Sequence, residues 1–309
     1  MSLTAFLLIV VSACLHATWN LMAKKNKMNW LFYTILGTMC WIVWSHVLIW
    51  TPVPYSRLPK EFWFWLLGST TAAELFYCSG VCWSYRCLEM SVAYPMMRSL
   101  PVLSVALVTS ILGLGSALSP IAAAGMVVVF SGCLLMPLVK FSDFSFRRYL
   151  DKGMVAVLMT ALGTTCYTVC DSQAQKVMVQ SLNAMQLDIS NTTITLSYYI
   201  IRLSCLCSFL WAVVFLVPAN RKSLKEDFFR LLPSAAPAGV FASGCYILAL
   251  MAMLHVTNVS YVQVFRQMGL ILGMLAGVVF LKERLTITKV VGVLLIVGGL
   301  VMTVIEKFF

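Results

Sequence analysis

Apolar residues occur along this chain in long blocks, and short polar or charged connections separate one block from the next. Each block has about the 20 residues that a helix needs to cross the hydrocarbon core of a bilayer. The pattern therefore predicts ten membrane-spanning helices. Their expected ranges are 2–22, 31–50, 62–86, 91–113, 121–139, 153–172, 192–217, 231–254, 258–280 and 287–306.

The composition agrees with this pattern. Of the 309 residues, 61% are hydrophobic and 11% are charged, whereas soluble domains carry roughly 25% charged residues. A soluble fold has no means of hiding so much apolar surface, so we expect an all-α integral membrane protein. The first apolar block has no basic residue before it and continues to Met22, which favours a retained helix over a cleaved signal peptide.

The second half of the chain repeats features of the first half. Shifted by 167 positions, Gly125 falls on Gly292. The same shift places Gly132 on Gly299. Each half then holds five spans, and because five is odd, the second half enters the membrane from the opposite side, as in the inverted repeats of many secondary transporters. The expected organisation is a first five-helix repeat at 1–140, a basic connecting loop at 141–152 and a second five-helix repeat at 153–309.

Lysine and arginine are distributed unevenly between the connections. The odd-numbered connections carry 15 of the 22 basic residues, the other connections and the carboxyl end carry 4, and 3 lie inside spans. By the positive-inside rule this bias predicts cytoplasmic odd-numbered connections, and we expect a bacterial cytoplasmic (inner) membrane protein. The net charge of +11 then reflects contact with anionic membrane lipid rather than with nucleic acid.

Four ionisable residues interrupt the apolar blocks: Glu74, Arg98, Arg202 and Arg266. A charged side chain at bilayer depth costs at least about 2.5 kcal/mol, so such residues usually line a cavity or a substrate path. An intramembrane pair of opposite charges can also clamp two helices together, and this structural alternative stays open for each residue. If the four converge, the cavity between them is net positive.

Polar residues three or four positions apart share one face of a helix, and such stripes occur in several spans. A second repeat register, with a shift of 151, lays Asn20 on Asp171. In span nine, Gln263 and Arg266 share a face that would be costly to expose to lipid, so we expect this face to line the cavity. The candidate substrate-binding residues are Trp19, Asn20, Glu74, Tyr94, Arg98, Tyr167, Asp171, Arg202, Tyr261, Gln263 and Arg266.

Guanidinium groups favour carboxylate and phosphate because they form paired, charge-assisted hydrogen bonds with them. Three arginines against one glutamate therefore favour an anionic or zwitterionic substrate, with Glu74 binding its amine or a coupled proton. A second interpretation is an aromatic cage for a quaternary amine or a cationic drug, with Glu74 as the counter-charge. Its walls would be Trp19, Trp83, Tyr94 and Tyr261. His16 is interpreted as a packing residue rather than a proton carrier.

Three segments resemble the EamA branch of the drug/metabolite transporter superfamily. They are LHATWN at 15–20, SVAYPMMRSLP at 91–101 and LKERL at 281–285. The resemblance covers essentially the whole chain. It implies a ten-helix transporter of small metabolites, often an exporter of amino acids or related compounds.

The first half departs from the family pattern at one place. Ser116 and Ala117 stand where the second half keeps Glu283 and Arg284. We interpret this Glu-Arg pair, at the membrane edge, as an intracellular anchor or gate contact rather than a substrate ligand.

Together these observations predict a secondary active transporter that exports a small zwitterionic or anionic metabolite, such as an amino acid or an aminophosphonate. Alternating access would operate at a midplane cavity between the two repeats. The sequence holds no Gly-x-x-x-x-Gly-Lys loop, so direct coupling to ATP is not expected. With no catalytic constellation or zinc-ligand spacing, we expect no enzyme activity, cofactor or metal. The expected partners are the small-molecule substrate, a coupled proton and membrane lipid, in a monomer or a homodimer.

Overall fold

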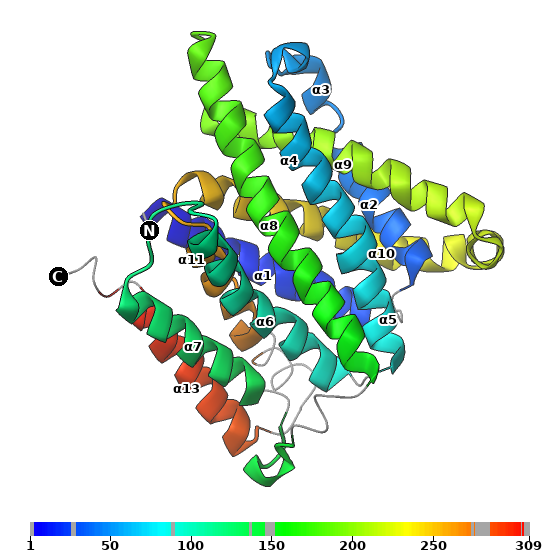
Figure 1. Cartoon of the computed structure of the whole chain (residues 1–309). Coiled ribbons are helices and arrows are strands. Elements are labelled where there is room, and N and C mark those ends of the chain that lie inside the picture. Colours follow the sequence, from blue (N-terminus) through cyan, green and yellow to red (C-terminus); the bar gives the residue numbers. More distant parts are fainter. Residues whose placement is uncertain are drawn as a thin grey trace.

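The computed structural model describes residues 3–25, 29–87, 90–135, 138–145, 152–272, 275, 285–303 and 305. Inside these ranges, the side chains at 20–21, 23–25, 74, 85–86, 90–96 and 152 lie outside the description. Every regular element in the described ranges is a helix. Figure 1 shows these helices packed into one bundle, coloured in their order along the chain.

The elements of the first half are α1 (Leu3–Lys25), α2 (Trp30–Trp44), α3 (Val47–Trp50), the 3-10 helix η1 (Tyr55–Arg57), α4 (Lys60–Thr71), the π-helix η2 (Ala72–Cys78), α5 (Ser79–Cys87), α6 (Met90–Ile111) and α7 (Pro120–Leu135). After the 3-10 helix η3 (Phe141–Asp143) come α8 (Lys152–Ala184), α9 (Asn191–Leu216), α10 (Pro218–Leu254), α11 (Ser260–Phe265) and α13 (Ile287–Met302). Polar side chains fix three of the helix starts, because Asn29, Ser190 and Thr286 each accept a hydrogen bond from a backbone N–H of the first turn.

Length and composition identify the helices that can cross a membrane. Over the described residues, four stretches are long and apolar enough: Trp30–Trp50, Gly153–Ala184, Asn191–Leu216 and Pro218–Leu254. Four shorter apolar helices accompany them: Leu3–Trp19, Met97–Ile111, Pro120–Leu135 and Ile287–Met302. Large hydrophobic side chains such as Ile49 and Phe64 are exposed on the outer surface, which marks a surface that contacts lipid. The chain is an all-helical integral membrane protein.

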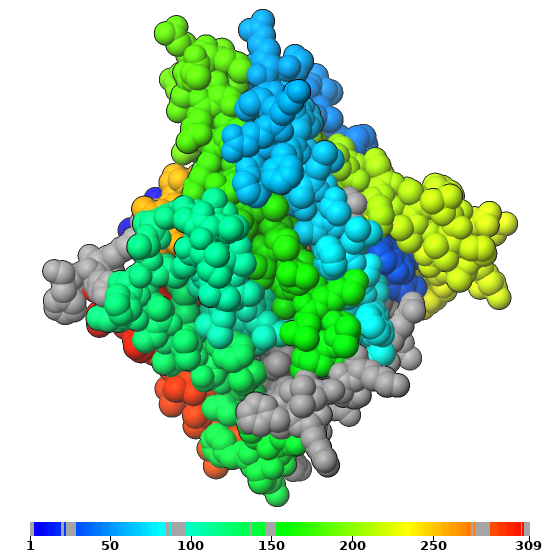
Figure 2. All heavy atoms as spheres, in the orientation of Figure 1, coloured from blue at the N-terminus to red at the C-terminus, as the bar shows by residue number. Residues whose placement is uncertain are grey.

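Two helices continue beyond the apolar blocks that predicted them. α8 ends at Ala184 instead of 172, and α10 begins at Pro218 instead of 231. Hydropathy marks only the apolar part of a helix, and the first turns of α10 carry charged residues that pair along its surface, as Arg230 does with Asp227 at 2.7 Å. In Figure 2, the end of α9 and the start of α10 project as an arm from the body of the molecule.

Two predicted spans are interrupted rather than continuous. Span three consists of α4, η2 and α5, so its middle is a π-helix. Span nine begins with α11, turns at Arg266 and Gln267, and resumes as helix at Met268. Interruptions of this kind are frequent at binding sites, because unwound or widened backbone can line a cavity. The hydropathy of a whole block does not reveal them, because Glu74 in η2 and Arg266 and Gln267 at the second break are too few to divide an apolar block.

The packing joins helices of the first half to helices of the second half. α1 packs along α10, α8 packs along α4, η2 and α5, and α2 packs along α9. α6 contacts both α7 and α8. Figure 1 shows α7 and α13 side by side at one end of the molecule.

Glycine brings α7 and α13 together at two points. A Cβ atom on Gly125 would lie 2.7 Å from the carbonyl oxygen of Gly299. One on Gly132 would lie 2.6 Å from the carbonyl oxygen of Gly292. Small residues at membrane helix crossings allow this close backbone approach, and any larger residue would push the two helices apart.

Candidate functional site

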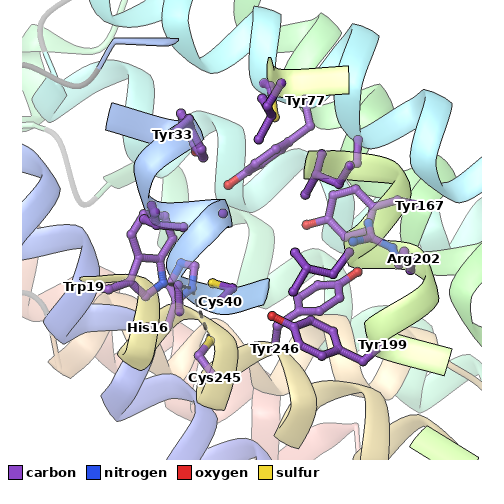
Figure 3. Close-up of a pocket in the computed structure, with 18 of the residues that line it drawn as sticks. His16, Trp19, Tyr33, Cys40, Tyr77, Tyr167, Tyr199, Arg202, Cys245 and Tyr246 are labelled. Atoms are coloured by element: carbon purple, nitrogen blue, oxygen red, sulfur yellow. Dashed lines mark hydrogen bonds between the residues drawn. The ribbon is translucent and has the colours of Figure 1, made fainter. Parts of the chain in front are cut away.

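A cavity of about 130 Å³ lies in the middle of the bundle, between helices of both halves. Its walls come from α1, α2, η2, α8, α9, α10 and the turn after α11. Figure 3 shows the space, with aromatic side chains on opposite sides of it. The lining residues are His16, Trp19, Tyr33, Leu36, Gly37, Cys40, Ala73, Tyr77, Cys78, Tyr167, Tyr199, Arg202, Leu203, Leu206, Leu210, Ala242, Cys245, Tyr246 and Arg266.

Arg202 of α9 belongs to one wall of the cavity and forms an ion pair behind it. Its Nε atom donates to Asp171 Oδ1 of α8 at 2.9 Å and to Ser69 Oγ of α4 at 2.8 Å. Asp171 is completely buried. Its oxygens also accept hydrogen bonds from the hydroxyls of Ser69, Tyr198 and Tyr246. A carboxylate offers about four acceptor sites, and four donors of the protein meet this one, three at Oδ1 and one at Oδ2.

The rest of the Arg202 guanidinium lies against aromatic rings. Its Cζ atom is 4.9 Å from the centroid of the Tyr246 ring and 5.6 Å from that of the Tyr167 ring, within the range of a cation–π interaction. Within the described residues, neither Nη atom makes a hydrogen bond. This edge of the guanidinium therefore remains available to a bound molecule.

Aromatic rings form a connected wall on the Arg202 side. Tyr77 meets Tyr167 edge to face, with ring centroids 5.6 Å apart. Tyr167 meets Tyr246 at 6.2 Å, and Tyr246 meets Tyr199 at 6.1 Å. The π-helix η2 supplies Tyr77 to this wall. Trp19 of α1 stands on the opposite side of the cavity (Figure 3).

Arg266 reaches the cavity from the break that follows α11. It caps the C-terminal end of this short helix, and the residue is only 5% exposed. Among the described side chains, no carboxylate lies within ion-pair distance of it. A buried cation without an anionic partner is costly, so the described part of the site has the capacity to bind an anion.

Arg98 of α6 supports the break from behind. Its Nη2 atom donates to the carbonyl oxygen of Arg266 at 2.6 Å. Carbonyl groups at a helix C-terminus carry partial negative charge, which a cation stabilises. Arg98 is half-buried and does not line the cavity, so its contact with the site is through the backbone of Arg266.

His16 of α1 lies between two groups that can only donate. Trp19 Nε1 donates to His16 Nδ1 at 3.2 Å, while Arg98 Nη1 lies 2.8 Å from His16 Nε2. A neutral imidazole has one acceptor nitrogen, so it satisfies one of the two donors at a time. The ring also lines the cavity, so His16 does more than fill a packing contact.

The candidate residues fall at different places around the cavity. Those in its lining are Trp19, Tyr167, Arg202 and Arg266. Asp171 and Arg98 stand behind the lining, each bonded to one of the cavity arginines. Outside the description lie the side chains of Asn20, Glu74 and Tyr94, and the residues Glu283 and Arg284.

Three residues do not lie where the sequence placed them. Tyr261 and Gln263 are buried but outside the lining. The chain turns at Arg266, so Arg266 leaves the helix face that it would share with Gln263 in a continuous span. Trp83 is 42% exposed on the outer surface and is not a cavity wall.

Fifteen lining residues are missing from the candidate set, and four of these are tyrosines: Tyr33, Tyr77, Tyr199 and Tyr246. Tyr77 and Tyr199 stand in the polar stripes of spans three and seven, so the stripe signal could have identified them. Tyr246 is the exception, because its place depends on its hydrogen bond to Asp171 across the contact of α10 with α8. Spacing along one helix does not encode such a contact.

The cavity lies between helices of both halves of the chain, and Arg202 and Arg266 belong to its lining. This arrangement in a helical membrane bundle is typical of solute transporters. The chain belongs to the EamA-like transporter family, whose family model matches residues 151–305. This confirms the resemblance to the EamA branch, a family of membrane transporters in the drug/metabolite transporter superfamily.

Solved structures show the same fold. One crystal structure, described only as that of a protein, aligns with a TM-score of 0.67 over 99% of this chain and 99% of its own, at 16% sequence identity. At that identity the likeness shows the fold alone. No curated protein matches the sequence.

Proposed function

We propose that this protein is a secondary active transporter that exports a small anionic or zwitterionic metabolite, such as an amino acid or an aminophosphonate. The observation that carries the proposal is the buried, cavity-lining Arg266, which no carboxylate among the described side chains neutralises. Burying the charge of Arg266 costs free energy, and binding of a substrate anion in the cavity during transport would offset this cost. Family membership supports transport.

The proposal includes two inverted five-helix repeats, 1–140 and 153–309, with the cavity between them. The contacts of the described helices support it, because α1 packs on α10 as α8 packs on α4, η2 and α5 when the halves are exchanged. The glycine contacts between α7 and α13 support it as well. Under the shift of 167 residues, the contact of Gly125 with Gly299 becomes that of Gly292 with Gly132, as a two-fold axis requires.

Alternating access would use the two interrupted spans. Both contribute to the lining, η2 through Tyr77 and the break after α11 through Arg266. The regular helical hydrogen bonds are already interrupted at such breaks. The helix segments on either side can therefore change their angle without breaking further hydrogen bonds. Rocking of one repeat against the other would then open the cavity to one side of the membrane at a time.

We also propose a bacterial cytoplasmic membrane location with the odd-numbered connections in the cytoplasm. The exposed basic residues at the start of α10 support this orientation: Arg221, Lys222, Lys225 and Arg230. On the cytoplasmic side they would contact anionic lipid headgroups. An impermeant maleimide should label Lys222→Cys above the parent level in inverted vesicles and not in intact spheroplasts.

Flux assays on the full-length protein in liposomes test the transport proposal. Liposomes preloaded with amino acids or aminophosphonates should show counterflow of a radiolabelled substrate with the wild type. Arg266→Ala should reduce this flux to the level of empty liposomes. Arg57→Ala is the matched control, because Arg57 is exposed in η1. Equal flux in Arg266→Ala and the wild type would contradict the proposed site.

The aromatic rings around the cavity favour a second candidate, a transporter of quaternary amines or cationic drugs. The Arg202 guanidinium weakens this candidate, because it already lies against Tyr167 and Tyr246. An internal cation there repels a cationic ligand. Choline counterflow that survives Arg266→Ala would favour the second candidate over the first.

A further inference from the structure

We propose that the cavity selects a flat, ring-bearing monocarboxylate, with the carboxylate on Arg266 and the ring between Trp19 and the tyrosine wall. The proposal rests on the transport function above and narrows its substrate class. Three properties of the site lead to it: the aromatic surfaces on both sides, the single cation without a described counter-charge, and the volume.

The aromatic surfaces form a slot. One side consists of the connected rings of Tyr167, Tyr246 and Tyr199, and Trp19 lies across the open space from them (Figure 3). Aromatic pairs in offset or edge-to-face geometry gain about 0.5–1.5 kcal/mol beyond the burial of area. A ligand with a π-system gains this at each wall, whereas an aliphatic ligand of the same size gains only burial. The slot therefore favours a flat ring.

The charges favour one negative group and no ammonium. Arg202 is already neutralised by Asp171 at 2.9 Å. Asp171 is completely buried, lies outside the lining and already binds four donors of the protein, so a ligand amine does not reach this carboxylate. Arg266 lines the same space, is 5% exposed and has no described carboxylate partner. A single carboxylate on the ligand supplies the counter-charge that the described side chains do not offer to Arg266.

The volume favours one ring. The cavity measures about 130 Å³, and an apolar protein cavity of roughly 150 Å³ holds a benzene molecule. One six-membered ring therefore fills the slot, and its carboxylate extends to Arg266 at the wall. Larger ring systems would require the helices to move apart.

Equilibrium binding to the purified full-length wild type in nanodiscs tests the inference without any mutation. The probe is radiolabelled benzoate at pH 8, where its carboxylate is ionised. We expect benzoate to bind at least tenfold more tightly than cyclohexanecarboxylate, which has the same charge but no π-system. We also expect benzoate to bind at least tenfold more tightly than phenylalanine, which carries an additional ammonium group. Benzyl alcohol, which lacks the charge, should not compete at a hundredfold excess.

Two variants separate the contribution of the charge from that of the ring. Arg266→Gln should abolish benzoate binding. Tyr199→Leu should weaken benzoate about tenfold and leave cyclohexanecarboxylate within twofold of the wild type. Tyr55→Leu is the matched control, because Tyr55 lies outside the lining, and it should leave both affinities unchanged. Monodisperse elution of each variant checks its folding.

Each part of the inference has its own contradicting result. Equal affinity for benzoate and cyclohexanecarboxylate overturns the ring selectivity but leaves the proposed function standing. Phenylalanine binding more tightly than benzoate overturns the single charge and also leaves that function standing. If no carboxylate binds to the wild type while choline does, both the inference and the proposed function fail.

Discussion

Two buried arginines meet the same cavity, and they differ in what neutralises them. Arg202 lies against Asp171, which binds four donors from three helices, α4, α9 and α10. Arg266 lies on a break in a helix, with Arg98 behind its carbonyl group and no described carboxylate beside it. One arginine therefore holds helices together, while the other presents its charge to the cavity.

The difference teaches that burial of a charge does not by itself identify a binding residue. The partner decides the role. A buried ion pair with all its hydrogen bonds made is strongly destabilised when one member is removed. Removal of a buried cation that has no carboxylate beside it among the described side chains should cost little stability, because none of these side chains is left as an unpaired anion. Loss of the Asp171 partner of Arg202 should thus lower mainly the stability of the protein. Loss of Arg266 should lower mainly transport.

The largest expected effect comes from removing the partner of Arg202. Asp171→Ala leaves this guanidinium buried without its counter-charge and should lower the free energy of unfolding by about 3–5 kcal/mol. Denaturation of the purified protein in mixed micelles measures it. Asp188→Ala is the control, because Asp188 is exposed in the loop before α9. A loss no larger than that of the control would contradict the assignment of Asp171 as a structural anchor.

The second effect is on transport rather than stability. Arg266→Ala should lower kcat/KM for the transported anion at least a hundredfold, which corresponds to about 2.7 kcal/mol. Its unfolding midpoint should stay close to that of the wild type, since the substitution removes a cation without orphaning any carboxylate among the described side chains. Flux and denaturation curves from one preparation measure both. A large fall in stability with unchanged flux would reverse the roles of the two arginines.

A smaller effect is expected from one hydrogen bond of the Asp171 cluster. Tyr246→Phe removes the hydroxyl that donates to Asp171 Oδ2 and keeps the ring that lies against Arg202. Hydrogen bonds between membrane helices average about 0.6 kcal/mol and reach about 1.7 kcal/mol, so the stability should fall within this range. In the background of Asp171→Ala the same substitution should have no further effect, which a double-mutant cycle checks.

The smallest effect concerns the residue behind Arg266. Arg98→Gln keeps a donor near the carbonyl group of Arg266 but removes the positive charge at this helix end. Such an end charge is worth about 0.3–1 kcal/mol, so KM should rise up to about fivefold while kcat stays within twofold. Arg98→Ala should give a larger rise. A change in kcat alone would indicate that Arg98 acts in the conformational step instead.

Much of the fold follows from hydropathy, because a bilayer requires long apolar helices and charged residues mark where they leave it. The starts of α2, α9 and α13 fall within one residue of the predicted spans. The exceptions have a physical cause. η2 and the break at Arg266 lie inside blocks that are apolar as a whole, and the extension of α10 to Pro218 carries surface charge pairs that hydropathy counts as loop.

The sequence predicts those residues of the candidate site whose own chemical type differs from that of their neighbours in the chain. Buried charges such as Arg202 and Arg266 stand out in an apolar block, and both line the cavity. Their different roles were not predictable, since the pairing of Arg202 with Asp171 arises where α8 and α9 meet. The same holds for Tyr246, which approaches the site only through the packing of α10 on α8.

The two glycine crossings of α7 and α13 limit how the molecule can change shape. Backbone that touches backbone leaves no side chain to rotate aside, so the separation of these helices is fixed at Gly125 and Gly132. If the two halves move in the proposed transport cycle, we expect them to rotate about the contact of α7 with α13. In such a rotation the displacement of a helix grows with its distance from the axis. Helices far from α7 and α13, such as α9, would therefore move furthest.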